Sequence, residues 1–113
     1  MQTVVELPEF LRKSAKLLKP SERQSIINYL ACHVKSGDLI KGTGGIRKLR
    51  WAAQSKGKSG GVRVVYYYHN EAMPLFLLTA FGKGEKANIS KGERNKLATF
   101  TTLLVKNYGG SYE

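Results

Sequence analysis

The sequence predicts a small α+β domain in which helices pack on a mostly antiparallel sheet. Two observations lead to this prediction. Apolar residues keep helical spacing in the first third of the chain, and the pattern then changes to the period-two alternation of β-strands before helical spacing returns near the end. The expected order is β-α-α-β-β-β-α, and 113 residues are enough for a single domain, residues 1–113, with one core.

The chain is expected to open with a strand and a helix. A β-branched run within residues 2–8 favours the strand, and Pro8 closes it. Residues 9–19 then show the spacing of an amphipathic helix. The apolar face of this helix is predicted to consist of Phe10, Leu11, Ala15 and Leu18.

A second helix is predicted to follow at once. Ser21 can cap it, and Gln24 stands three residues later, as a capping box requires. Gly37 offers a left-handed stop after the helix. Cys32 lies among apolar residues of the helix, so we expect a buried, reduced thiol without an intrachain disulfide. The expected apolar stripe is Ile26, Ile27, Leu30, Ala31 and Val34.

Three strands and a final helix are predicted in the rest of the chain. Residues 46–53 and 61–69 alternate with period two, and the mostly apolar residues 74–81 should form a central, covered strand. The turn-like residues 70–74 make the last two strands an antiparallel hairpin. Residues 90–93 read as a capping box that opens the last helix. Its apolar face should contain Leu97, Phe100, Thr101 and Leu104, and its end is marked by Gly109 and Gly110.

The charge of the chain favours a polyanionic partner. The formal net charge is +11, from 19 Lys+Arg against 8 Asp+Glu, which suits RNA, DNA or an anionic membrane surface. No acidic residue lies between Asp38 and Glu71. The cations in that interval are Lys41, Arg47, Lys48, Arg50, Lys56, Lys58 and Arg63. The positive charge is therefore concentrated in the middle third of the chain.

Targeting signals are not evident in the sequence. No apolar run approaches the ~18–20 residues of a membrane-spanning helix, and no signal-peptide pattern opens the chain. A cytoplasmic location is therefore expected.

The segment GKSGG resembles the tail of a nucleotide-binding P-loop. Such a loop needs an earlier glycine and a following helix to hold the phosphates, but the first glycine position holds Ala52 and a strand follows. The sequence therefore argues against a nucleotide cofactor. Two interpretations stay open: a hairpin turn with solvated lysines, or a mobile basic loop that grips a phosphate backbone.

Several cations are expected to meet at one edge of the sheet. Lys48 and Arg50 project from the same side of their strand, and Arg63 lies near the start of the antiparallel return. Lys83 and Lys86 follow the end of the third strand. Because like charges lining one site cost stability, the arrangement favours a polyanion binder, with a solvated sheet face as the alternative.

The residue types in this region favour metal-free chemistry on RNA. No cluster of His, Cys or carboxylate residues argues for a metal, and no cofactor is expected. Arginine can hold a phosphodiester bidentately and stabilise its developing charge, and a lysine crowded by cations can serve as a general base. RNA carries a 2′-hydroxyl nucleophile that DNA lacks, so RNA is the favoured substrate.

Three blocks in order resemble the RelE/HigB superfamily of bacterial type II toxins: GTGGIRKLRWA, GKSGGVRVVYYY and PLFLLTAFGKGEKANIS. The resemblance covers about residues 38–100 and is closest to a HigB-like branch with a GKSGG-x-R segment. It implies a RelE-like fold and a ribosome-dependent endoribonuclease, an mRNA interferase that drives the 2′-hydroxyl onto the adjacent phosphate. It also implies a cognate antitoxin, often of the helix-turn-helix type, through which operator DNA is bound.

The resemblance implies roles for the predicted cations. Lys48 would be the general base or a charge stabiliser, Arg50 a phosphate contact, and Arg63 the arginine that stabilises the scissile phosphate. Lys83 and Lys86 would contact the backbone or the transition state.

The chain departs from the family pattern at two positions. Gly84 stands where many relatives have an arginine, and Ser90 or its neighbourhood stands where some use a tyrosine. The general acid is therefore left open between Lys86 and Arg63.

The remaining predicted contacts to RNA or the ribosome are cationic or aromatic. Arg47, Lys56 and Lys58 are the cations, and Tyr68 or Trp51 could stack on an mRNA base, with core packing as the alternative. A second function is a non-catalytic RNA- or ribosome-binding module with the same fold. DNA binding by the chain alone is less favoured, because no recognition-helix pattern stands out.

Overall fold

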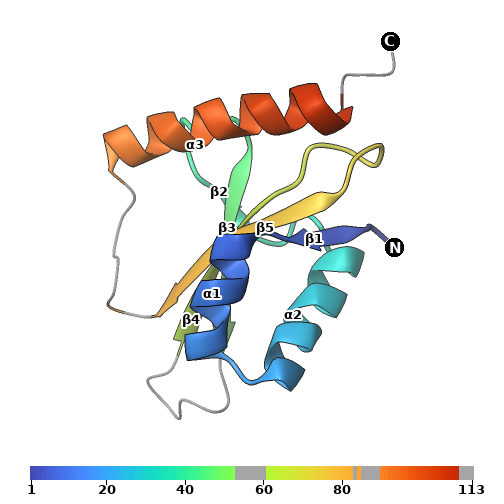
Figure 1. Ribbon diagram of the computed structural model, residues 1–113, viewed down its shortest axis with the longest axis vertical. Coiled ribbons are helices and arrows are strands. Elements are labelled where there is room, and N and C mark those ends of the chain that lie inside the picture. The colour runs from blue at the N-terminus through green and yellow to red at the C-terminus, as the bar shows by residue number, and fades with distance from the viewer. Residues whose placement is uncertain (53–60, 83, 85–89, 110–113) are drawn as a thin grey trace.

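The computed structural model describes residues 1–52, 61–82, 84 and 90–109, and these form an α+β structure in the predicted order with one additional short strand (Figure 1). The elements are β1 (Val4–Glu6), α1 (Pro8–Leu17), α2 (Pro20–Cys32), β2 (Asp38–Leu39), β3 (Ile46–Ala52), β4 (Gly61–Tyr67), β5 (Leu75–Gly82) and α3 (Lys91–Leu104), followed by a π-helical turn at Val105–Gly109. The additional strand is β2, which the sequence did not predict.

The strands form one five-stranded sheet in the order β1-β5-β4-β3-β2. β1 pairs with β5 in parallel, and the other three pairs are antiparallel, so the sheet is mostly antiparallel, as predicted. The predicted hairpin of β4 and β5 is confirmed. β5 is flanked by β1 and β4 and is almost entirely buried, which confirms that it is a covered inner strand.

The helices cover the two faces of the sheet separately (Figure 1). α1 and α2 enclose one core and α3 encloses the other. The first core contains Phe10, Leu18, Ile26, Leu30, Leu49, Val62, Val64, Tyr66, Leu75, Leu77 and Ala80. The second core contains Ile46, Val65, Tyr67, Met73, Phe76, Leu78, Phe81 and Leu104. No helix in the described ranges has the length and apolar character that a membrane span needs.

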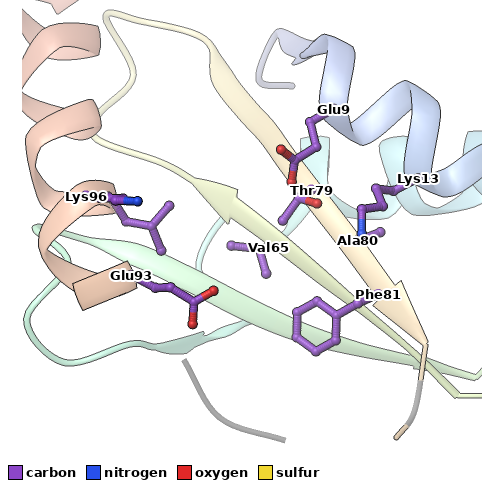
Figure 2. A pocket seen from close by; sticks show the side chains of 9 residues that line it. Glu9, Lys13, Val65, Thr79, Ala80, Phe81, Glu93 and Lys96 are labelled. Carbon is purple, nitrogen blue, oxygen red and sulfur yellow. The ribbon is translucent and has the colours of Figure 1, made fainter. Parts of the chain in front are cut away.

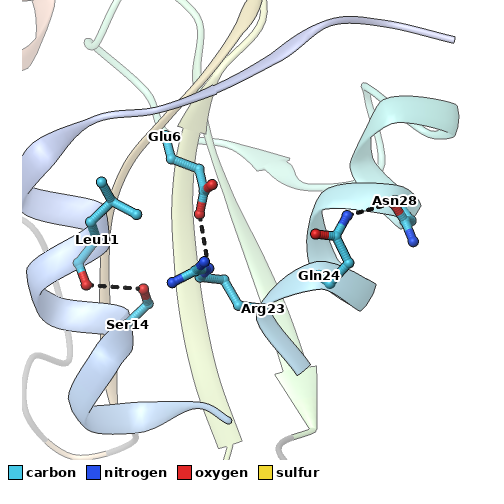
Figure 3. Close-up of polar contacts among 6 residues, drawn as sticks. All are labelled: Glu6, Leu11, Ser14, Arg23, Gln24 and Asn28. Atoms are coloured by element: carbon cyan, nitrogen blue, oxygen red, sulfur yellow. Dashed lines mark hydrogen bonds and ion pairs between the residues drawn. The ribbon is translucent and has the colours of Figure 1, made fainter. Parts of the chain in front are cut away.

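The buried face of α1 differs from the prediction. Phe10 and Ser14 are buried, whereas Leu11 is 39% exposed and Ala15 is also exposed. The expectation failed because it excluded Ser14 as polar. The Ser14 hydroxyl donates to the Leu11 carbonyl oxygen at 3.4 Å, so the buried hydroxyl keeps a hydrogen bond within the helix (Figure 3).

The N-terminus of α2 also differs from the prediction. Lys19 is the N-cap and Pro20 occupies the first helical position, where its fixed φ suits the helix. Ser21 therefore lies inside the helix and is not its cap. The carboxylate of Glu22 accepts from the Lys19 backbone N–H at 2.9 Å, so Glu22 takes the place in the capping box that was expected of Gln24.

Two further polar contacts fix α2 (Figure 3). Gln24 Nε2 donates to Asn28 Oδ1 at 2.9 Å, one turn along the helix. Arg23 Nε lies 3.1 Å from Glu6 Oε2 and ties the helix to β1. Because both side chains are partly exposed, this ion pair contributes no more than about 1 kcal/mol.

The thiol of Cys32 is exposed, so the prediction of a buried cysteine is wrong. The residues of α2 that face the core are Ile26, Leu30 and Ala31. Cys32 follows them as the last residue of the helix, where the helical rotation turns the next side chain toward solvent. The apolar stripe itself is confirmed, with Ile27 and Val34 packed against the core.

Gly37 does not stop α2, which ends five residues earlier at Cys32, and its φ is not positive. The glycine is needed instead for a close approach. A Cβ at this position would lie 2.8 Å from Tyr66 Cε1 and 3.1 Å from the Lys48 carbonyl oxygen. The segment before β2 therefore packs directly on the sheet.

The start and the apolar face of α3 agree with the prediction. The Ser90 hydroxyl accepts from the Glu93 N–H at 3.2 Å, and the Glu93 carboxylate accepts from the Ser90 N–H at 3.0 Å, which completes the capping box. Thr101 and Leu104 are buried. Thr101 Oγ1 also donates to the Thr43 carbonyl oxygen at 3.3 Å, which ties α3 to the turn between β2 and β3.

Candidate functional site

The sheet face beneath α3 is organised in three rows of cross-strand neighbours. Residues directly opposite on antiparallel strands project to the same face. A one-residue bulge in β5 beside Tyr66 allows residues 76 and 79 to share this face. Read from β3 through β4 to β5, the first row is Ile46, Tyr67 and Phe76; the second row is Lys48, Val65 and Thr79; the third row is Arg50, Arg63 and Phe81.

The rows become more polar and more exposed from the first to the third. The first row is fully apolar or aromatic and is buried in the second core. In the second row Lys48 and Thr79 are half-buried, and in the third row Arg50 is exposed and Arg63 is half-buried. The open end of this sheet face is therefore cationic.

We define the cationic cluster as Lys48, Arg50 and Arg63. The prediction that Arg63 joins the other two on one sheet face is confirmed, because Arg50 and Arg63 are direct cross-strand partners. Within the described part of the chain, these three side chains form no ion pair. Like charges placed directly opposite each other destabilise a sheet, and a bound phosphate would relieve that repulsion.

Gly61 makes room for the guanidinium of Arg63. A Cβ built on Gly61 would lie 3.3 Å from Arg63 Nη1, so the guanidinium folds back over the first residue of its own strand. The group that carries the charge therefore lies at the start of β4, which is at the end of the sheet away from α3 (Figure 1). Several N–H donors in a planar fork at an open sheet end can receive the oxygens of a phosphodiester.

Asp38 is a candidate site residue that sequence reasoning missed. It is the direct cross-strand partner of Lys48 and lies on the same sheet face, with an exposed side chain. A strand of two residues is too short to show period-two alternation, so the sequence did not predict that Asp38 lies opposite Lys48. The available signal was the glycine-rich turn at residues 42–45, which joins two extended segments as a hairpin does.

Three residues hold β2 in place, and we call them the β2 clamp: Gly37, Arg47 and Tyr66. The Tyr66 hydroxyl accepts from the Gly37 N–H and donates to the Val34 carbonyl oxygen, both at 2.9 Å. Burial raises the pKa of Tyr66, because the ionised phenolate would be desolvated. Arg47 Nη1 donates to the Gly37 carbonyl oxygen at 2.7 Å. Asp38 directly follows this fixed segment.

Arg47 lies on the opposite face from the cationic cluster. Its cross-strand partner is Tyr66, which belongs to the first core, and its guanidinium also donates to the Lys35 carbonyl oxygen at 3.1 Å. The arginine thus has a structural role in the β2 clamp. Its predicted contact with RNA or the ribosome stays a prediction.

The two predicted stacking residues also lie on the sheet face that α1 and α2 cover, opposite the cationic cluster. Tyr68 and Trp51 are half-buried and pack against the first core, and the Trp51 ring meets Tyr29 edge-on at 5.7 Å. These contacts favour the core-packing alternative. A role in stacking on RNA stays a prediction for both residues.

Four predicted site residues, Lys56, Lys58, Lys83 and Lys86, lie outside the described residues. The strand β4 begins directly after residues 53–60, so the element that follows GKS is a strand, as expected, and not the helix that a P-loop requires. Among the residues that the structure describes, no three His, Cys, Asp or Glu side chains are grouped to hold a metal ion.

Comparison with known families places this arrangement in context. A family model described as the RelE toxin of the RelE / RelB toxin-antitoxin system matches residues 18–109. The matched segment includes α2, all of the strands from β2 to β5, and α3. It therefore contains the whole cationic cluster and Asp38.

Proposed function

This chain belongs to the RelE toxin family of toxin–antitoxin systems, and on that premise we propose that it is a ribosome-dependent endoribonuclease that cleaves translated mRNA. The single observation that carries the proposal is the cationic cluster at the open end of the sheet. Its charges are of the kind that bind a phosphodiester, and their mutual repulsion favours an anionic partner.

In the proposed reaction, Arg63 and Arg50 hold the scissile phosphate. Two guanidinium groups from adjacent strands can each donate two hydrogen bonds to its oxygens. The 2′-hydroxyl of the preceding ribose attacks the phosphorus, and the bond to the 5′-oxygen of the next nucleotide breaks. The arginines stabilise the charge that develops on the phosphorane, an effect typically worth about 100- to 1,000-fold in rate per donor.

The proton of the attacking hydroxyl needs an acceptor. The resemblance to the family implies Lys48 as general base or charge stabiliser, and the cross-strand partner of Lys48 is Asp38, which carries a carboxylate. We propose that Asp38 accepts the 2′-hydroxyl proton and that Lys48 stabilises the phosphorane. The general acid for the leaving 5′-oxygen is proposed to be Lys86 or Arg63.

The proposed partners are the ribosome with its mRNA and a cognate antitoxin. Family membership supports an antitoxin, because the family consists of toxins from toxin–antitoxin pairs. We propose that the antitoxin, of the helix-turn-helix type, is the component that binds operator DNA. The strongly positive charge of the chain supports RNA as the polyanion that the toxin itself contacts.

The proposal is tested by incubating the purified protein with a defined mRNA, with and without ribosomes, and mapping new 5′ ends by primer extension. We expect new ends only when ribosomes translate the message. If wild-type protein produces no new ends under translation, the nuclease proposal is wrong.

The alternative is a non-catalytic RNA- or ribosome-binding module, which the glycine at position 84 favours because many relatives have an arginine there. That module would bind ribosomes with an affinity that falls steeply with salt, and it would leave the mRNA intact. Cosedimentation with ribosomes, run beside the cleavage assay, separates the two functions.

A further inference from the structure

The proposed general base lies on a weakly protected edge strand. β2 has two residues and forms one edge of the sheet. Asp38 is exposed, and the side chain of Leu39 is 61% exposed. Strand ends with little buried apolar surface open easily, so burial alone does not keep β2 against β3. The position of the Asp38 carboxylate must therefore depend on other contacts.

Pairing with β3 places Asp38 in the second row of the sheet face beneath α3. Its direct partner is Lys48, and Val65 and Thr79 complete the row. Val65 and Thr79 line a cleft of about 310 Å³ between α1 and the N-terminal half of α3, which shows the side to which the row projects (Figure 2). A carboxylate in this row lies beside Lys48 and next to the row that holds the two arginines.

The turn end of β2 is held by backbone and core contacts. The Ile40 N–H donates to the Ile46 carbonyl oxygen at 2.8 Å, and Ile40 packs against the second core. The Thr43 hydroxyl donates to the Ile40 carbonyl oxygen at 2.6 Å. Asp38 lies at the opposite end of the pairing with β3. These contacts therefore fix the turn but not the end of β2 that carries the carboxylate.

The β2 clamp holds the Asp38 end from the opposite face of the sheet. Arg47 and Tyr66 are direct cross-strand partners, so their side chains are neighbours, and both reach the segment that leads into β2. The Tyr66 hydroxyl accepts from the Gly37 N–H at 2.9 Å, and Arg47 Nη1 donates to the Gly37 carbonyl oxygen at 2.7 Å. Both backbone polar groups of the residue before Asp38 are thus bound by the clamp.

The chemistry of the two side chains suits a fixed contact. Burial raises the pKa of Tyr66, so the phenol is neutral near pH 7 and keeps the proton that it donates to the Val34 carbonyl oxygen. The guanidinium of Arg47 stays protonated and presents its donors in a rigid plane. A Cβ on Gly37 would lie 2.8 Å from Tyr66 Cε1, so the segment packs directly on the ring. The backbone before β2 therefore has little freedom to move.

We propose that Arg47 and Tyr66 are positioning residues of the nuclease, because they keep the Asp38 end of β2 paired and so hold its carboxylate beside Lys48. This proposal rests on the proposed function for the role of Asp38, and it adds two residues from the other face of the sheet. Neither side chain contacts the RNA. Both act through the backbone of β2 alone, which distinguishes this role of Arg47 from its predicted contact with RNA or the ribosome.

The amide of Lys48 reports whether the Asp38 end is paired. Ile40 donates a ladder hydrogen bond to Ile46. Asp38 and Lys48 lie two residues further along their strands, so they form the next hydrogen-bonded pair of the antiparallel ladder. The Lys48 N–H therefore faces Asp38, and it exchanges with solvent when this end of β2 opens.

The first test measures this opening without cleavage, by amide hydrogen exchange. We expect Tyr66→Phe and Arg47→Met each to speed exchange at Lys48 by about threefold to tenfold, relative to the amide of the fully buried Val64. The reference to Val64 removes any change in global stability. Unchanged relative exchange in both variants would overturn the proposal.

Tyr67→Phe is the matched control. Tyr67 is a buried tyrosine on the same strand as Tyr66, but its hydroxyl lies 3.2 Å from Nδ1 of the exposed His69 and not beside the segment before β2. We expect this variant to leave the relative exchange at Lys48 unchanged. Faster relative exchange in the control would show that any lost tyrosine hydroxyl loosens β2, which would overturn the specific role of the clamp.

The second test measures the kinetics of cleavage in the ribosome assay. Tyr66→Phe and Arg47→Met should lower the maximal cleavage rate by about threefold to tenfold and leave the half-saturating concentration of ribosomes unchanged. Tyr67→Phe should cleave like the wild type. A raised half-saturating concentration in Arg47→Met would show that Arg47 contacts RNA or the ribosome, which would overturn its positioning role.

The third test asks whether the clamp acts through Asp38. Tyr66→Phe added to Asp38→Asn should cause no further loss of cleavage, because the carboxylate that the clamp positions is already absent. A merely structural loss would lower the rate by the same factor in both backgrounds, and that result would overturn the proposal. Urea denaturation checks that every variant is folded under the conditions of the assay.

The two proposals can fail separately. If the wild type produces no new 5′ ends under translation, the nuclease proposal is wrong, and hydrogen exchange at Lys48 alone decides whether the clamp places Asp38. If the wild type cleaves and Asp38→Asn cleaves equally fast, the nuclease proposal stands and the positioning role is wrong.

Discussion

At one end of the sheet face beneath α3, Ile46, Tyr67 and Phe76 are packed under the helix, whereas at the other end the exposed Arg50 and the half-buried Arg63 are direct cross-strand partners. The same three strands supply both ends. Period-two alternation keeps the side chains on one face, and distance from α3 decides whether they meet protein or solvent. The first row should therefore determine stability, and the third row should determine activity.

The largest effect is expected from a substitution in the buried first row, and it should appear in the free energy of unfolding. Replacing Phe76 by Ala removes a fully buried ring that also contacts Tyr108, with ring centroids 5.0 Å apart. We expect the free energy of unfolding to fall by about 3–5 kcal/mol, measured by urea denaturation. A loss below about 1 kcal/mol would show that the first row does not carry the stability.

The next largest effect is expected from a substitution in the third row, and it should appear as a loss of cleavage without a loss of stability. Arg63→Ala should lower ribosome-dependent cleavage about 100-fold or more, while the free energy of unfolding stays the same or rises because the repulsion with Arg50 is removed. Arg12→Ala, on the exposed surface of α1, is the matched control and should cleave normally. Full activity of Arg63→Ala would refute the assignment of the site.

The β2 clamp should give a smaller, pH-dependent effect on stability. Tyr66→Phe leaves Gly37 N–H and Val34 C=O without their partner and should cost about 1–3 kcal/mol near neutral pH. Because burial raises the pKa of Tyr66, the wild type should keep this contribution below pH 10.0, the ordinary tyrosine value, and lose it as pH rises further.

Urea denaturation of both proteins between pH 8 and pH 11 checks this prediction. The difference in stability between wild type and Tyr66→Phe should shrink at the alkaline end. A difference that grows with pH would contradict the burial of a neutral phenol. Burial also raises the pKa of Tyr67. Because Tyr67 is present in both proteins, its titration affects both stabilities and cancels in the difference between them.

The smallest effect is expected at Asp38. Asp38→Asn keeps the size of an exposed side chain, so the free energy of unfolding should change by less than about 0.5 kcal/mol. If the carboxylate accepts the 2′-hydroxyl proton, the cleavage rate should fall about tenfold or more. Unchanged cleavage at saturating ribosomes would return the role of general base to Lys48.

The sequence was sufficient for features that depend on local pattern. Alternation along residues 46–53 and a hairpin return were enough to bring Arg50 and Arg63 to one face, and the capping box at Ser90 marked the start of α3. These predictions needed only neighbours in sequence or a single antiparallel turn.

The features that were missed depend on contacts between distant segments. Gly37 was read as a helix stop, but its close approach to Tyr66 is a tertiary contact that leaves no local signal. Ser14 was left out of the buried face because its polarity outweighed its position in the helix. Asp38 was missed because a two-residue strand is defined by its partner β3 and not by its own residues.

The facing arginines have a consequence for laboratory evolution. A library of this chain selected only for resistance to heat or protease should accumulate changes at Arg50 or Arg63, because Thr or Val in either place removes the repulsion and suits a strand. A library selected for growth arrest should keep both arginines. Sequencing the two pools would measure, position by position, how far the stability optimum of this chain lies from its functional optimum.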